Sequence, residues 1–342
     1  MPKTKKSLTI RQIAALAEVS VSAVSKVLNN RSDVSPSTRQ KVTDIIRKNN
    51  YRRRVSTVRS KLVGVVFPSL KADHITSAYV STLLAGLTDF FFEKDIRVEL
   101  IKEEQLPHNG DDFFQFCMEA NLSGVIVLLS LLSDHYLGKL GSVFPVVVTG
   151  NNLGACDAVC VRYDALCAGR KATAHLLELG HRNIGFIAED QLHHDQVYRC
   201  RGYRETLEAS GIQIVEDWIF DLQRYEMRDI VHRLEYVLGK PGAPTAFVVS
   251  NDNKAVEILD ILRSIGKVVP RDISIIGFDD LPFARHLAPP LTTVSQPIYR
   301  IGYQAGQGLF DLMAARKGSK PQDVVLDCEL IIRASTAPLA GR

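Results

Sequence analysis

Four polar side chains near the amino terminus recur at the spacing of one helix face. Ser22, Ser25, Lys26 and Asn29 stand at i, i+3, i+4 and i+7, which places them on the same side of an α-helix. Three of them are short hydrogen-bonding groups and one is a cation. A face of this kind lets a helix backbone approach the floor of the DNA major groove, where each base pair presents its own donors and acceptors. The alternative is an ordinary solvated helix face.

The charge around these residues favours a polyanionic partner. Residues 1–61 hold fifteen Lys and Arg against three acidic residues, a net charge of +12, whereas residues 62–342 carry −8. A basic segment on a mildly acidic body is typical of a chain that binds nucleic acid through one small part. The surrounding bases would supply the salt-dependent attraction to phosphates.

A second group of polar side chains lies just beyond apolar runs that are typical of strands. Asp164 follows AVCVRY, Asn251 follows AFVVS and Asp279 follows ISIIGF, while Arg199 opens a predicted helix. Ligands of open parallel sheets bind beyond the carboxyl ends of the strands. An Arg fork donates to adjacent hydroxyls and a carboxylate accepts from them, so this group predicts a site for a polar small molecule. The alternative is a purely structural ion pair between Arg199 and Asp279.

The sequence shows no pattern that is typical of catalysis or metal binding. It has neither a Gly-rich phosphate loop nor a nucleophile elbow. His193 and His194 have no Cys or His partners at zinc spacing. The six cysteines are scattered, and without an export signal we interpret them as reduced thiols. We expect no catalytic residue, no metal and no cofactor.

The basic segment must be built from short helices that hold the polar face outward. An apolar stripe predicts a first helix over residues 9–17, with Thr9 as its N-cap. A second helix is expected over 21–29, capped by Ser20, and a third starts at Ser35-Pro36. Three short helices with a tight turn after the first are typical of a helix-turn-helix module.

The remainder alternates apolar strands with helices, which indicates parallel sheets covered on both faces. Two such series predict two doubly wound α/β lobes. Strands are expected at 62–67, 97–101, 124–129, 144–150, 158–163, 184–188, 246–250, 273–278 and 324–332. Helices are expected near 77–93, 112–120, 165–179, 199–210, 228–238, 253–264 and 298–315.

Length and composition agree with two or three folded domains, and we expect the chain in the cytoplasm. The 342 residues are too many for one ordinary domain, and 46% of them are hydrophobic. No stretch reaches the roughly 18 uncharged apolar residues that a membrane helix needs, and the basic start has no apolar segment behind it. We expect no membrane partner.

The basic segment resembles a known DNA-binding headpiece. The run TIRQIAALAEVSVSAVSKVLNNRSDVSPSTRQKV is similar to that of the LacI/GalR family of bacterial transcription regulators. The resemblance implies base reading by Val21, Ser22 and Lys26, and backbone contacts by Ser20, Ser25 and Asn29. Thr9, at the start of the first helix, joins the expected DNA contacts.

The resemblance extends over about residues 8–335 and implies a body like the periplasmic binding proteins. HLLELGHRNIGFIA, RCRGYRETLEASG, SND, VPRDISIIGFDD and LTTVSQP occur in the family's order. It implies a headpiece over 1–50, a basic linker over 51–61 and a body over 62–342. The N-lobe would comprise 62–162 and 295–318, and the C-lobe 163–294 and 319–336. The implied effector contacts are Tyr79, Asp164, Arg199, Trp218, Asn251 and Asp279; for Trp218 a packed aromatic is the equal alternative.

Three departures from the family pattern affect the expected sites. The segment SLKADHITSAY lacks the usual Asn-Pro-aromatic turn before Tyr79, and Tyr163-Asp164 replaces an Asp-Asn pair. The linker is short and rich in Arg. The resemblance implies a linker leucine that wedges into the DNA minor groove, and the position aligned with it falls near Ser60. Leu62 either shifts to serve as this wedge or opens the first strand, and we expect it to open the strand. Electrostatic contact with the minor groove or with phosphates would then replace apolar wedging into the minor groove. The cations concerned are Arg52, Arg53, Arg54 and Arg59.

The sequence therefore predicts a DNA-binding transcriptional regulator that is not an enzyme. We expect a repressor that binds a near-palindromic operator as a homodimer and responds to a sugar or sugar derivative. The alternatives are a sugar-binding receptor, which the basic head disfavours, and a DNA-binding regulator whose ligand cleft is vestigial.

Overall fold

The computed structural model describes most of the chain, in twelve stretches. They are residues 9–28, 31, 33–49, 62–67, 78–106, 110–128, 140–141, 144–150, 158–188, 194–222, 227–314 and 322–339. The predicted contacts Asn29, Arg52, Arg53, Arg54 and Arg59 lie outside these residues, as does Ser60.

Three helices form the amino-terminal module: α1 (Ile10–Leu16), α2 (Val21–Leu28) and α3 (Pro36–Lys48). Thr9 caps α1, because its side chain accepts from the Gln12 amide and Gln12 bonds back to Thr9. The Ser20 hydroxyl accepts from the Ala23 amide at 3.0 Å at the start of α2. The helices pack on one another around buried Ile13, Val24 and Val42. The predicted helix-turn-helix module is confirmed.

The rest of the chain is divided between two compact units. The first also includes the amino-terminal module and comprises Met1–Ile75, Leu83–Val161 and Tyr299–Val324. The second comprises Thr76–Thr82, Arg162–Ile298 and Val325–Arg342. The chain therefore passes between the units several times, and each unit is built from segments that are distant in sequence.

The first sheet has six strands in the spatial order β11-β5-β4-β3-β1-β2. Their bounds are β1 (Leu62–Phe67), β2 (Arg97–Lys102), β3 (Val125–Leu128), β4 (Val146–Thr149), β5 (Val159–Tyr163) and β11 (Val324–Leu326). The pairs from β2 to β5 are parallel. The helical elements of this part are α5 (Ala78–Glu93), η1 (Glu103–Gln105), α6 (Gly110–Glu119) and α12 (Ile298–Ala314). Leu62 opens β1 opposite Arg97, as predicted.

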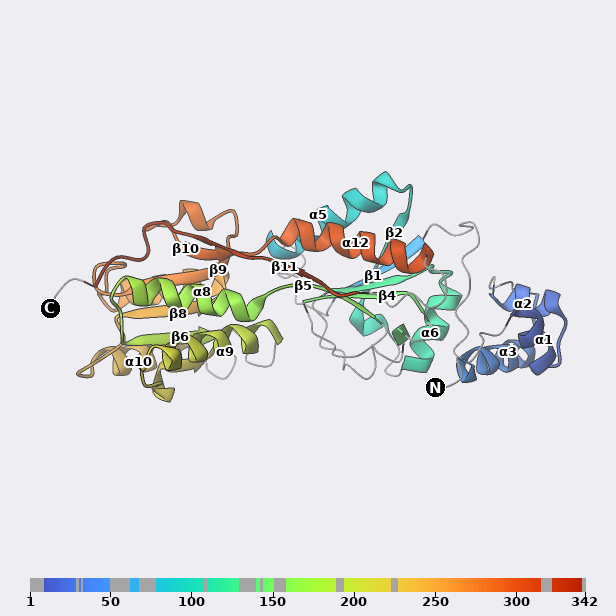
Figure 1. Ribbon diagram of the computed structural model, residues 1–342, viewed down its shortest axis with the longest axis horizontal. Helices are drawn as coiled ribbons and strands as arrows, with labels where there is room; N and C mark the ends of the chain where they lie inside the picture. The colour runs from blue at the N-terminus through green and yellow to red at the C-terminus, as the bar shows by residue number, and fades with distance from the viewer. Residues whose placement is uncertain are drawn as a thin grey trace. The chain divides into compact units, whose positions relative to one another are not determined.

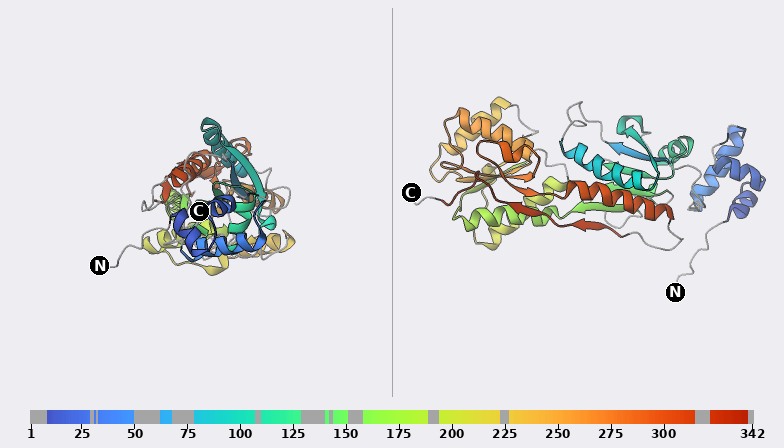
Figure 2. Two further views of the ribbon diagram at one scale, coloured as in Figure 1. Left: turned by 90° about the vertical axis from the view of Figure 1, so that its right-hand side faces the viewer. Right: turned by 90° about the horizontal axis from the view of Figure 1, so that it is seen from above.

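The second sheet follows the order β12-β10-β9-β8-β6-β7. Its strands are β6 (Ile184–Ala188), β7 (Ile219–Asp221), β8 (Ala246–Ser250), β9 (Ser274–Asp279), β10 (Thr292–Ser295) and β12 (Glu329–Ile331). Only β12 is antiparallel to its neighbour. The helical elements are α8 (Ala165–Glu178), α9 (His194–Ala209), η2 (Glu216–Trp218), α10 (Met227–Leu238), α11 (Asp252–Ser264) and η4 (Ala284–His286). Helices α8 and α9 cover one face, and α10 and α11 the other (Figures 1 and 2).

Strand order and burial confirm the doubly wound fold. The sequence-consecutive strands β6 and β7 are neighbours, and β8 pairs with the other side of β6. The order of connection therefore reverses at β6, which is the point where such sheets bind ligands, beyond the carboxyl ends of the strands. Strands β6, β8 and β9 are buried along their whole length, as expected for a sheet covered on both faces.

Two sequence predictions about elements are wrong. The run 324–332 is not one strand: it forms β11 at the edge of the first sheet and β12 at the edge of the second. Helix α9 begins at His194, not at Arg199, which therefore lies in its second turn. In the described residues, no helix is both long enough and apolar enough to cross a membrane.

Candidate functional site

The amino-terminal module presents the predicted polar face on α2. Val24, Val27 and Leu28 are buried on one side of this helix, and Val21 and Ser22 are exposed at its start. Val21 is 46% exposed although it is apolar. An exposed apolar group at a helix start suits contact with a thymine methyl in the major groove.

Lys26, the cation of this face, has an acidic partner within the module. Its Nζ lies 2.7 Å from Asp33 Oδ2, and the two side chains are 44% and 59% exposed. The hydrogen bond from Lys26 lowers the pKa of Asp33. Exposed ion pairs contribute little to stability because solvent screens them, so a phosphate or a guanine edge could displace Asp33 at little cost.

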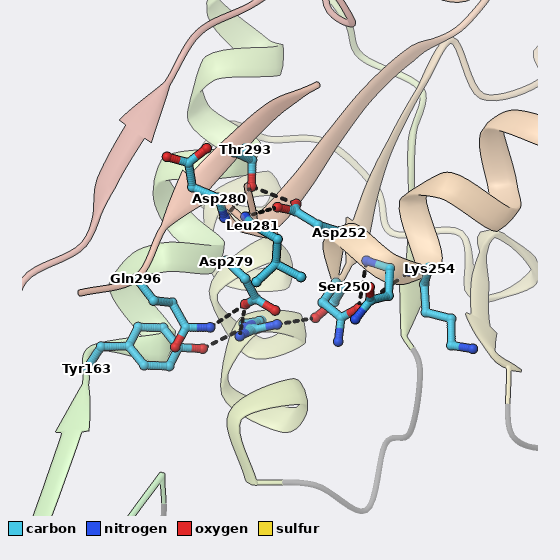
Figure 3. Close-up of polar contacts among 12 residues, drawn as sticks. Tyr163, Ser250, Asp252, Lys254, Asp279, Asp280, Leu281, Thr293 and Gln296 are labelled. Atoms are coloured by element: carbon cyan, nitrogen blue, oxygen red, sulfur yellow. Dashed lines mark hydrogen bonds and ion pairs between the residues drawn. The ribbon is translucent and has the colours of Figure 1, made fainter. Parts of the chain in front are cut away.

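A buried arginine organises the candidate effector site. Arg199, 3% exposed, donates from Nε to the Tyr163 hydroxyl (2.6 Å), from Nη1 to Ser250 Oγ (2.7 Å) and from Nη2 to Asp279 Oδ1 (3.2 Å). Figure 3 labels Tyr163, Ser250 and Asp279 and draws their hydrogen bonds and ion pairs as dashed lines. Ser250 ends β8 and Asp279 ends β9, so the cluster lies at the carboxyl edge of the second sheet.

The surroundings favour the charged form of Arg199. Its guanidinium carbon lies 4.6 Å from the centre of the Phe278 ring and 5.5 Å from that of Tyr163, distances typical of cation–π contacts. Burial alone would lower the pKa of Arg199, but Tyr163, Asp279 and Asp195 together raise it. Burial likewise raises the pKa of Tyr163. At neutral pH the cluster therefore contains a cation beside a neutral phenol.

The Asp279 carboxylate is held in a strained turn. Its Oδ1 also accepts from Gln296 Nε2. Asp279 has φ 106° and Asp280 φ 53°, in the region that favours glycine, at a cost of about 1–3 kcal/mol each. Strain of this size persists only where other contacts hold the turn.

Two further ionisable groups lie near Arg199. Asp195 precedes it by one turn of α9, and burial together with the Asp279 charge raises the pKa of Asp195 to about 7. Burial and the carboxylates of Asp195 and Asp279 raise the pKa of Tyr79. The charges of Arg199 and Asp279 therefore act on the Tyr79 hydroxyl. These three residues are among the predicted effector contacts.

Asp164 and Asn251 have structural roles as helix caps. Asp164 accepts from the Cys167 amide at 2.9 Å at the start of α8. The Asn251 side-chain oxygen accepts from the amides of Asn253 and Lys254 at the start of α11. Both residues lie beyond the carboxyl end of a strand, as expected, but Oδ1 of each already accepts hydrogen bonds at a helix amino terminus.

Trp218 does not join the cluster. Strand β7 pairs with β6 through Ile219 and Phe186. Trp218 therefore lies just before β7, toward the amino ends of the strands, whereas Asp279 lies at the carboxyl end of β9. It packs against the core on the α10 and α11 side of the sheet. Of the two interpretations offered for Trp218, the structure supports the packed aromatic. Asp221, which ends β7 and is 7% exposed, lies at the carboxyl edge instead.

Sequence reasoning missed several members of the cluster. Tyr163, Ser250 and Gln296 appear in the sequence only as parts of longer motifs, and no local signal distinguishes them from other polar residues. Among the described residues, three buried polar atoms near these segments have no hydrogen-bond partner: Arg162 Nε, Gln196 Oε1 and Gln296 Oε1. Buried polar atoms are rarely left unpartnered, so these atoms suit a polar ligand.

Comparison with known families agrees with this architecture. Residues 9–54 match the family described as "Bacterial regulatory proteins, lacI family". Residues 173–336 match the "Periplasmic binding protein-like domain". The first match covers the amino-terminal module, and the second covers Arg199, Ser250, Asp279 and Gln296 of the cluster but not Tyr163.

Curated relatives match nearly end to end. The transcriptional regulator CelR of Thermobifida fusca is 30% identical, with 96% of this chain and 98% of the relative covered. The transcriptional regulator DegA of Bacillus subtilis is 28% identical, with 97% and 98% covered.

Solved structures match over the same extent. A complex of CelR with cellobiose has a TM-score of 0.70 at 28% identity and covers 96% of this chain and 99% of that one. The lac repressor dimer bound to operator has a TM-score of 0.68 and covers 97% and 100%; at 22% identity it supports the fold alone. From the headpiece, the two doubly wound sheets and the end-to-end likeness to CelR, we conclude that this chain belongs to the LacI family of bacterial transcriptional regulators.

Proposed function

We propose that the protein is a repressor that binds a near-palindromic operator as a homodimer, and that a sugar or sugar derivative at the Arg199 cluster changes this binding. The observation that carries the proposal is a buried, charged hydrogen-bonding cluster at the ligand-binding edge of a doubly wound sheet, in a chain that begins with a helix-turn-helix module. The relatives support it, because DegA and CelR are transcriptional regulators and CelR was determined with cellobiose.

The proposed DNA contacts come from α2 and its surroundings. Lys26, Val21 and Ser22 would read base edges, and the Lys and Arg of residues 1–61 would bind phosphates. A single headpiece covers few base pairs, so two headpieces related by a two-fold axis would read a near-palindrome. We place this activity in the cytoplasm, at the nucleoid, and assign no catalytic role to the chain.

The proposed effector contacts come from residues that can exchange hydrogen bonds with hydroxyls. Arg199 and Asp279 would bind adjacent hydroxyls, and Tyr79 would supply an aromatic face. The ligand can shift DNA binding only as far as its affinities for the DNA-bound and free arrangements differ.

A vestigial site is the second candidate, and one observation favours it. Three guanidinium nitrogens of Arg199 already bond to protein groups, so the cluster is largely satisfied without a ligand. The buried Gln296 Oε1 has no hydrogen-bond partner, which favours a functional ligand site.

A thermal-shift and DNA-binding screen separates these candidates. The full chain is heated with cellobiose, ribose, glucose, galactose, sugar phosphates and nucleobases, and each compound that raises the melting temperature is added to an anisotropy titration with operator DNA. We expect at least one neutral sugar to do both, and Asp279→Asn to abolish both effects while DNA binding survives. If no compound shifts the wild-type protein, or if Asp279→Asn responds normally, the effector assignment is wrong.

A further inference from the structure

The turn that carries Asp279 is held by hydrogen bonds to a second acidic side chain, which makes no hydrogen bond to Arg199. Asp252, the first residue of α11, is fully buried. Its Oδ2 accepts from the Leu281 amide at 3.0 Å, and its Oδ1 accepts from the Thr293 hydroxyl at 2.7 Å. One side chain thus joins the start of α11, the turn after β9 and strand β10 (Figure 3).

These bonds act where the backbone needs support. Asp279 and Asp280 both adopt positive φ, and the Leu281 amide held by Asp252 belongs to the next residue. The Thr293 hydroxyl also accepts from the Asp280 amide at 3.4 Å. On the other side of the turn, Arg333 Nη2 binds Asp280 Oδ1 at 2.5 Å.

The Asp252 side chain packs closely against β9 at Gly277. A Cβ built on Gly277 would lie 2.3 Å from Asp252 Oδ1, so only glycine leaves room for the carboxylate at that point of the strand. The two acidic groups also interact electrostatically: burial first, and then the Asp279 charge, raise the pKa of Asp252 to about 8. Asp252 therefore lies close to the Asp279 turn without bonding to Arg199.

We propose that Asp252, acting with Thr293, is a positioning residue that sets the left-handed turn at Asp279 and Asp280 and thereby aims the Asp279 carboxylate at the ligand site. Asp252 does not contact the ligand; it acts through the Leu281 amide and the Thr293 hydroxyl. The inference deepens the proposed function, because it names what controls the geometry of that site.

The first measurement needs no ligand. Amide hydrogen exchange is followed in the full chain for the segment 279–282 in wild type, Asp252→Ala and Asp252→Asn. We expect Asp252→Ala to speed exchange in this segment about tenfold or more, the equivalent of one lost buried hydrogen bond. Asp252→Asn keeps an acceptor oxygen in a side chain of the same shape and should restore part of the protection.

Ser335→Ala is the matched control. Ser335 is also fully buried, and its hydroxyl accepts from the Thr292 amide at 2.8 Å and donates to the Ile275 carbonyl at 2.6 Å. It lies near the amino end of β9, away from the turn. We expect this variant to lose a comparable amount of stability without selective exchange at 279–282. Uniform exchange across the unit in both variants, in proportion to stability, would overturn the inference.

A second pair of variants decides the matter if Asp252→Ala does not fold. Thr293→Val removes the hydroxyl that bonds to Asp252, whereas Thr293→Ser keeps it. Selective exchange at 279–282 in the Val variant, reversed in the Ser variant, supports the inference; equal exchange in the two rejects it.

Ligand affinity provides the last arm. For any sugar that shifts the melting temperature of the wild type, Asp252→Ala should weaken binding at least about tenfold, against less than about twofold for Ser335→Ala. If the screen finds no sugar, the proposed effector role fails while the exchange experiment still tests the positioning role. If a sugar binds Asp252→Ala as tightly as the wild type, the positioning role fails alone.

Discussion

At the level of single residues, Lys26 and Arg199 are both cations, yet they stand in opposite surroundings. Lys26 is 44% exposed with one acidic neighbour, whereas the Arg199 side chain is 4% exposed and bonded to three protein groups. An exposed cation on a helix is free to exchange partners. A buried, bonded one is costly to remove. Substitution of Lys26 should therefore be detected in a DNA-binding assay, and substitution of Arg199 in a stability assay.

Replacing Lys26 by Ala should weaken specific DNA binding by about 1–3 kcal/mol, as expected for a lost base contact, without lowering the melting temperature of the second unit. Replacing Arg199 by Ala leaves Asp279 buried without its cation and should lower that melting temperature while DNA affinity changes little. Anisotropy with selected operator DNA and scanning calorimetry measure the two effects. Equal losses of DNA affinity in both variants would contradict the headpiece assignment.

Lys26 is paired with Asp33, so DNA would have to replace this carboxylate to bind the Lys26 ammonium group. Asp33→Asn removes this competing charge and should tighten DNA binding by up to about fivefold, because an exposed ion pair is weak. Asp44→Asn removes the same charge elsewhere in the module, on α3, and serves as the control. Titrations of the two variants at one salt concentration should show the larger gain for Asp33→Asn; an equal gain would mean that only net charge matters.

His181 should make the stability of the second unit depend on pH. It is buried and bonds to Thr245, Ser274 and the Ala337 carbonyl, and burial lowers its pKa. The folded state then binds this proton more weakly than the unfolded state, so the contribution of His181 falls as pH drops below about 6.5, the unfolded value. Buried carboxyls with raised pKa, such as Asp252, give the opposite trend, so a difference must be measured.

The quantity to measure at each pH is the melting temperature of the wild type minus that of His181→Gln, because the subtraction removes the contribution of the other titrating groups. We expect it to be largest near pH 7.5 and to shrink toward pH 5, because glutamine cannot take up the proton. A constant difference over this range would show that His181 does not titrate differently in the two states.

At the level of elements, the position of Arg199 depends on the close approach of α8 and α9. A Cβ on Gly169 of α8 would lie 2.1 Å from the Arg199 carbonyl oxygen. Gly202 of α9 faces Leu166 of α8 in the same way, at 2.3 Å. Each helix therefore presents a glycine to the backbone of the other, and α9 can carry Arg199 to the sheet edge.

Gly169→Ala should destabilise the second unit by about 1–3 kcal/mol, the usual cost of overpacking, although alanine is the better helix former. It should also weaken any effector response, because α9 must shift. Gly308→Ala in α12 is the control, since a Cβ there would meet its nearest neighbour at an ordinary 3.6 Å and should leave stability unchanged or higher. Chemical denaturation of both variants checks the contrast, and equal stability would refute it.

The sequence predicted the elements whose signals are local. Capping residues marked α1 and α2, and continuous apolar runs marked β6 and β8 to the residue. The start of α9 was missed because His194 and Asp195 carry no apolar stripe, and β7 was missed because three residues form no pattern. The division of 324–332 between two sheets depends on contacts with β5 and β10, which no local signal contains.

The candidate site was predictable only in part, for the same reason. Arg199 and Asp279 stand out by charge and by motif, and the structure pairs them. Tyr163 and Gln296 join them through the fold. The role of Asp252 needs the positive φ of the turn and the register of β9 and β10, neither of which is visible in a sequence.

At the level of the whole molecule, function is divided between parts of opposite charge. The basic segment over 1–61 suits DNA, whereas the acidic remainder carries the buried Arg199 cluster. Specific DNA binders of this kind hold their sites about 10³–10⁷ times more tightly than random DNA. This ratio, at a stated salt concentration, is the quantity that the headpiece assignment must explain.

The most direct test selects duplexes from a random library with the full chain and then titrates the enriched duplex with the full chain and with a chain that begins at Leu62. We predict a near-palindromic sequence, bound by the full chain at least about 10³-fold more tightly than a scrambled duplex, and no measurable binding by the shortened chain. Intact affinity in the shortened chain, or no enriched sequence at all, would contradict the account.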